Sequence, residues 1–102
     1  MNTKYDLSEF VNIPTKERII KGLISRVKER RKELNLTQKE LAEKSGVSYA
    51  SVRRFETTGE ISFTSLLKIA EVVNCLSDFD NLFNHEIIKD LRCYRHENTK
   101  NN

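Results

Sequence analysis

The chain has 102 residues, of which 37% are hydrophobic and 32% are charged, and its formal net charge is +3. This length leaves room for one domain with one core, and the composition is too apolar for an intrinsically disordered chain. The small positive charge permits an anionic partner, but it is equally consistent with a charge that only aids solubility.

The N-terminal segment, residues 1–14, is too apolar to be a free tail. It carries apolar side chains at short intervals: Tyr5, Leu7, Phe10, Val11 and Ile13. We expect this segment to be an arm that packs either on the domain or on another chain.

The first predicted helix covers residues 15–34 and contains one residue that does not fit its pattern. Apolar residues recur every three or four positions, which indicates an amphipathic helix: Ile20, Leu23, Ile24, Val27 and Leu34. Arg31 falls on the same apolar face. An arginine at this place is either a helix-end residue whose head group reaches water or one half of a buried ion pair.

Two short helices are predicted next. Thr37 and Glu40 have the spacing of a capping box, which marks the start of a helix, and Gly46 suits the left-handed position that ends one. Ser48 follows as an N-cap residue, so we expect the next helix over about residues 49–57.

The rest of the chain predicts two more helices and a C-terminal extension. The helix that begins at Ser62 is apolar almost all round, which predicts the most buried helix of the set, and Cys75 is expected in the core. A short helix over residues 77–83 has acidic residues in its first turn. The extension, residues 85–102, should end in disorder. Before that end, four apolar residues share one helical face: Ile87, Ile88, Leu91 and Tyr94.

No motif indicates an enzyme, a metal or a cofactor. No nucleophile is grouped with a base, and the glycines are too scattered for a phosphate-binding loop. His85 and His96 lie outside any cluster of carboxylates or thiolates, so two surface histidines are favoured over a metal site. Cys75 and Cys93 show no pairing pattern, which favours reduced thiols in the cytoplasm. No apolar run approaches the ~18 residues of a membrane span, and no secretory signal is evident.

Residues 37–57 have the features of a helix-turn-helix. Ala42 is small where the two helices would cross, Gly46 would make the turn, and the second helix would attach to the core through Val47, Val52 and Phe55. At 100° per residue, its opposite face carries Ala50, Arg53, Arg54 and Thr57. A short helix with a small buried side and a basic outer side is typical of major-groove reading, and a merely solvated face is the weaker alternative.

The stretch RVKERRKELNLTQKELAEKSGVSYASVRRFE, above all its LTQxELAxxxGVS core, resembles the Cro/CI-type helix-turn-helix regulators, the Xre family. The resemblance covers roughly residues 23–83. It implies an all-α fold, a five-helix, lambda-repressor-like DNA-binding domain over residues 15–84 with short N- and C-terminal extensions. It also implies a homodimer that binds a pseudo-palindromic operator in double-stranded DNA.

The resemblance assigns roles by position. At the start of the second helix, phosphate contacts fall to Thr37 and Gln38. In the recognition helix, base-reading positions hold Tyr49, Ala50 and Arg54, and backbone or flank contacts fall to Ser48, Ser51 and Arg53. Arg31 matches one half of a buried ion pair of the phage repressors, and Glu56 the other. Tyr49 and Ala50 stand where amides are frequent, so direct readout is poorer in hydrogen bonds. Glu60 stands where phage repressors carry a basic residue, which removes a phosphate contact.

The sequence leaves two functions open. The first is a sequence-specific repressor that acts as a homodimer in the bacterial cytoplasm, at the nucleoid. The second rests on the segment FETTGEIS…SLLKIAEV…FDNLF, which is similar to HipB-like antitoxins. It implies an interaction protein that neutralises a toxin and autoregulates its operon. The apolar flanks and the thin base-reading face favour a partner beyond DNA.

Overall fold

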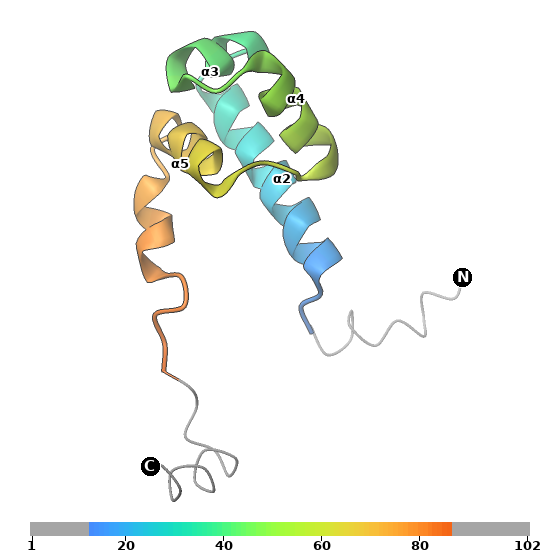
Figure 1. The fold of residues 1–102 in the computed structure, drawn as a ribbon, viewed down its shortest axis with the longest axis vertical. Coiled ribbons are helices and arrows are strands. Elements are labelled where there is room, and N and C mark those ends of the chain that lie inside the picture. The colour runs from blue at the N-terminus through green and yellow to red at the C-terminus, as the bar shows by residue number, and fades with distance from the viewer. Residues whose placement is uncertain (1–12, 87–102) are drawn as a thin grey trace, which may run out of the picture.

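A computed structural model describes residues 13–86, which are helical with no strand among them (Figure 1). The elements in chain order are α2 (Lys16–Glu33), α3 (Gln38–Ser45), α4 (Tyr49–Thr58), α5 (Phe63–Val72) and the 3₁₀ helix η2 (Leu76–Asn81). The predicted all-α fold of five helices is confirmed. The shortest element differs in kind and place, because a 3₁₀ helix over Leu76–Asn81 replaces the expected helix over residues 77–83.

Hydroxyl side chains begin the four α-helices of residues 13–86. The N-cap residues are Thr15, Thr37, Ser48 and Ser62, and each side chain accepts a hydrogen bond from a backbone N–H in the first turn. The capping box is confirmed, since Thr37 Oγ1 accepts from Glu40 N at 3.0 Å while Glu40 Oε1 accepts from Thr37 N at 2.9 Å. Gly46 ends α3 at φ +78° and Gly59 ends α4 at φ +86°, a left-handed conformation that favours glycine.

The core lies where α3, α4 and α5 meet the C-terminal part of α2, whose first turns extend beyond the other helices (Figure 1). Its buried apolar residues are Val27, Leu41, Ala42, Val47, Val52, Phe55, Ile69, Ala70 and Val73. Phe55 and Val52 come from the inner side of α4, so the expected attachment of the second short helix to the core is confirmed.

Helix α5 is less buried than its composition predicts. Only Ile69 and Ala70 are buried within it, whereas α4 buries three residues. Phe63 at its start is 58% exposed. The expectation that this is the most buried helix is therefore wrong, because one side of α5 faces an apolar groove that η2 covers only in part. Cys75 is half-buried at the edge of the core rather than inside it.

Several sequence predictions lie outside the described residues. These are most of the N-terminal arm (1–14), the C-terminal extension beyond residue 86, the disordered end, Cys93, His96 and the apolar residues Tyr5, Leu7, Phe10, Val11, Ile87, Ile88, Leu91 and Tyr94. Of the two flanks, Ile13 is described and is 52% exposed. None of the described helices is long and apolar enough to cross a membrane.

Candidate nucleic-acid interface

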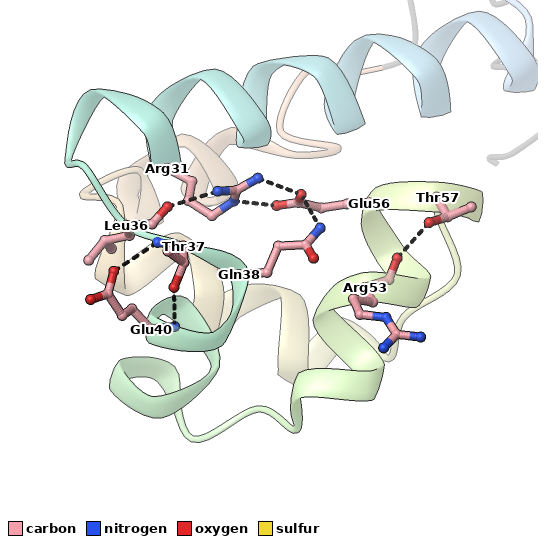
Figure 2. Close-up of polar contacts among 8 residues, drawn as sticks. All are labelled: Arg31, Leu36, Thr37, Gln38, Glu40, Arg53, Glu56 and Thr57. Carbon is pink, nitrogen blue, oxygen red and sulfur yellow. Dashed lines mark hydrogen bonds and ion pairs between the residues drawn. The ribbon is translucent and has the colours of Figure 1, made fainter.

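A buried ion pair joins α2 to the end of α4 (Figure 2). Arg31 Nε donates to Glu56 Oε2, and Arg31 Nη2 donates to Glu56 Oε1, both at 2.9 Å. The side chains are 9% and 2% exposed. Arg31 therefore does not reach water as a helix-end residue would. Of the two arrangements that its position allows, the structure shows the buried ion pair.

Two further hydrogen bonds complete this ion pair. Arg31 Nη1 donates to the carbonyl of Leu36 at 2.8 Å, which ties the connection between α2 and α3. Gln38 Nε2 donates to Glu56 Oε1 at 2.9 Å from the first residue of α3. Three helices thus share one charge-assisted cluster, and such bidentate bonds fix orientation as well as distance.

The electrostatics of Glu56 follow from these contacts. Burial opposes its ionisation, but the hydrogen bonds from Arg31 and Gln38 outweigh burial and lower the pKa of Glu56. The carboxylate is therefore charged at neutral pH, and α4 is held in a defined direction against α2 and α3.

The turn between α3 and α4 is built from local hydrogen bonds. Gly46 donates its N–H to the carbonyl of Ala42 at 2.9 Å, and Ser45 Oγ accepts from Val47 N at 3.1 Å. Ser48 Oγ then accepts from Ser51 N at 3.0 Å and starts α4. The result is a helix-turn-helix in which α4 presents its side opposite the core to solvent.

The outer face of α4 carries the base-reading and flank positions expected from the sequence. Tyr49 is 41% exposed, and Ala50, Arg53 and Arg54 are exposed as well. The guanidinium of Arg53 lies 5.2 Å from the centroid of the Tyr49 ring, which orients the arginine through a cation–π contact. Figure 2 shows Arg53 directed away from the ion pair between Arg31 and Glu56.

Arg54 makes a contact that the sequence analysis missed. Its Nε and Nη2 both donate to Glu60 Oε1, just after the end of α4. The two side chains are 66% and 64% exposed, so solvent weakens their attraction. The only signal in the sequence is an arginine six residues before a glutamate with Gly59 between them, and that spacing does not match the four-residue helical pairing rule.

The two residues expected to contact phosphate, Thr37 and Gln38, already form hydrogen bonds within the protein. The Thr37 hydroxyl caps α3, and the Gln38 amide nitrogen bonds Glu56. Both residues nevertheless lie at the N-terminus of α3, where free backbone N–H groups and the helix dipole favour an anion. Within residues 13–86 no three metal-ligating side chains lie together. The chemistry that the described surface offers is hydrogen-bond donation from arginines and from a helix terminus.

One comparison with known proteins gives a match. A family model described as helix-turn-helix matches residues 27–78, about half of the chain. The match includes α3, the turn, α4 and α5 in full. No curated protein and no solved structure matches the chain significantly.

Proposed function

Since the chain belongs to the Cro/CI-type helix-turn-helix family of DNA-binding regulators, we propose that it is a repressor that reads the major groove of double-stranded DNA with α4. The observation that carries this proposal is the outer face of α4. Helix α4 is short, its outer face is exposed and basic, and the ion pair between Arg31 and Glu56 holds the helix against the rest of the domain. A rigid helix of this kind can enter the groove with its N-terminal turn foremost.

The side chains of α4 suit different parts of the duplex. Arg54 can form two hydrogen bonds with O6 and N7 of a guanine once it leaves Glu60, and Ala50 can contact a thymine methyl. Arg53, oriented by Tyr49, and the serines of the first turn contribute backbone contacts. At the start of α3, Thr37 and Gln38 face the phosphates with the helix N-terminus.

Selection of bound duplexes from a random pool tests this function. We expect a motif with two half-sites about one helical turn apart. On the selected operator, Arg54→Ala costs about 1–3 kcal/mol and relaxes the preference at one base pair. Arg53→Ala weakens binding to the operator and to a scrambled duplex alike. It also lowers by about one the salt slope, which is the steepness with which the logarithm of the binding constant falls with the logarithm of the salt concentration. Equal losses on both duplexes for the two variants would contradict the assigned roles.

The repressor is proposed to act as a homodimer, because one recognition helix with few base contacts discriminates too little in a genome. The apolar groove between α2, α5 and η2 supports this. The exposed residues that line it include Ile19, Phe63, Leu82 and Phe83. The described residues begin just before α2 and end just after η2, two of the elements that form the groove. Phe63→Ser and Leu82→Ser should then convert a dimer at micromolar concentration into a monomer that binds single half-sites. A wild-type monomer would contradict the dimer.

The second candidate function is that of an antitoxin, and the same groove favours it. An open apolar surface of this kind is suited to a partner protein as well as to a second copy. Co-expression with the product of a neighbouring gene tests this role. If the two proteins purify together and Phe63→Ser separates them while operator binding is retained, the groove serves a toxin. If Phe63→Ser lowers operator affinity and no neighbouring product binds, the groove serves the homodimer.

A further inference from the structure

Three lysines of α2 form a stripe beside the proposed recognition helix. Lys21, Lys28 and Lys32 are seven and four residues apart, which places them on one side of the helix over about 16 Å. They line a shallow hollow between α2 and α4, together with Ser25 of α2 and Thr57 of α4. We call these three residues the lysine stripe.

The stripe carries positive charge without a hydrogen-bonded partner among the described residues. Among residues 13–86, none of its three ammonium groups takes part in a hydrogen bond or an ion pair. Two acids line the same hollow: Glu29 contacts Arg30 at 3.5 Å, and Glu56 is bound by Arg31. The charge of Lys28 also acts on Glu56 and helps to lower the pKa of this carboxyl. An anion in this hollow would therefore meet three ammonium groups that no side chain of the described residues binds directly.

The hollow adjoins the outer face of α4. A second shallow hollow lies on that face, lined by Ala50, Ser51, Arg53, Arg54 and Thr57. Thr57 lines both, so the hollow with the lysine stripe meets the hollow with the proposed base-reading positions at this residue. Because the N-terminal turn of α4 enters the groove first, its C-terminal end with Thr57 lies toward the groove edge, where the phosphates are.

We propose that the lysine stripe of α2 is a phosphate track that binds the DNA backbone at the edge of the groove read by α4. The inference rests on the proposed DNA-binding function and adds a contact surface from a helix outside the helix-turn-helix itself. The stripe is long enough to follow several phosphates, which are spaced about 3.4 Å along the axis per strand. It supplies affinity without sequence preference.

The test compares variants of equal charge on the operator and on a scrambled duplex of the same length. The stripe variant is Lys21→Gln/Lys28→Gln, which keeps Lys32 because basic residues in the last turn of α2 favour the helix. The control is Lys16→Gln/Lys68→Gln, whose residues line neither hollow. The rescue variant is Lys21→Arg/Lys28→Arg. Circular dichroism and thermal unfolding of each variant establish that it is folded.

We expect the stripe variant to lower the salt slope by about 0.9 for each lost phosphate contact, by the same amount on both duplexes. At about 0.15 M salt this corresponds to roughly fivefold weaker binding for each contact. The rescue variant should bind as the wild type does, and the control should keep its slope. An unchanged slope in the stripe variant, or an equal loss in the control, would overturn the phosphate track while wild-type operator preference stands. A wild-type protein without preference for any duplex would instead overturn the proposed function.

Discussion

Arg31 and Glu56 bind each other through two hydrogen bonds of 2.9 Å, although 25 residues separate them in the chain. If either side chain were removed, the charge of the other would stay buried without its partner. Such a loss costs more than the pair itself contributes, because the desolvated charge stays behind.

A double-mutant cycle measures this coupling. We expect Arg31→Met or Glu56→Gln alone to lower the free energy of unfolding by about 3–5 kcal/mol. The double variant should cost less than the sum of the two, with the difference measured by urea unfolding. Additive effects would mean that the pair is not coupled. Arg30→Met serves as the control, since its partners Glu29 and Glu33 are exposed and such pairs are worth under about 1 kcal/mol.

The lowered pKa of Glu56 predicts loss of stability in acid. A carboxyl whose pKa is lower in the folded state than in the unfolded state stabilises the fold above the unfolded pKa, which is about 4.3 for glutamate. This contribution disappears as the pH falls through the folded pKa. The free energy of unfolding of the wild type should therefore fall more steeply below about pH 4.3 than that of Glu56→Gln. Parallel curves for the two proteins would assign the acid sensitivity to other carboxyls.

How much of this arrangement the sequence predicts depends on the range of each interaction. The caps at Thr37 and Ser48 and the turn at Gly46 are formed by groups within four residues of one another, so local spacing suffices to predict them. The partner of Arg31 lies on another helix. Helical spacing left two possibilities there, and only the resemblance to a family pointed to Glu56.

The contact between Arg54 and Glu60 predicts a competition with DNA. Glu60→Gln should free Arg54 and remove a negative charge close to the proposed interface, which raises affinity for operator and scrambled duplexes by up to about fivefold, the equivalent of ~1 kcal/mol for an exposed pair. Fluorescence anisotropy at two salt concentrations measures the gain. Glu71→Gln on α5 removes the same charge away from α4, and an equal gain there would show that Arg54 is not restrained by Glu60.

Two glycines allow a matched test of backbone conformation and space. Alanine at either Gly46 or Gly59 meets the strain of a left-handed φ, about 1–2 kcal/mol. A Cβ at Gly46 has nothing within 4 Å, whereas one at Gly59 would lie 2.3 Å from Ile20 Cγ2. Thermal or urea unfolding should show Gly59→Ala to be worse than Gly46→Ala by about 1–3 kcal/mol. Adding Ile20→Ala should recover part of that difference, and no recovery would place the strain elsewhere.

The exposure of α5 was not predictable from its residues. Apolar side chains all round a helix indicate what the helix can bury, but not whether a neighbour covers each side. Here Leu66 and Phe63 line the apolar groove, and η2 covers it only in part through the edge-on contact of Phe79 with Phe63, 6.0 Å between ring centroids. Whether a side chain is buried depends on which other elements pack against its helix. The periodicity of one helix carries no information about those elements.

The short connections between the helices bear on how fast this fold forms and opens. Residues 34–37, 46–48, 59–62 and 73–75 join successive elements, so most residues that lie close in space are also close in sequence. Helical proteins with such local topology fold in about microseconds to milliseconds. When the opened protein recloses faster than a protease cleaves it, the rate of degradation depends on the equilibrium population of the open state and not on the unfolding rate. We therefore expect any ligand of the native state, DNA included, to lengthen the lifetime of the protein by the factor 1 + L/Kd, where L is the concentration of free ligand.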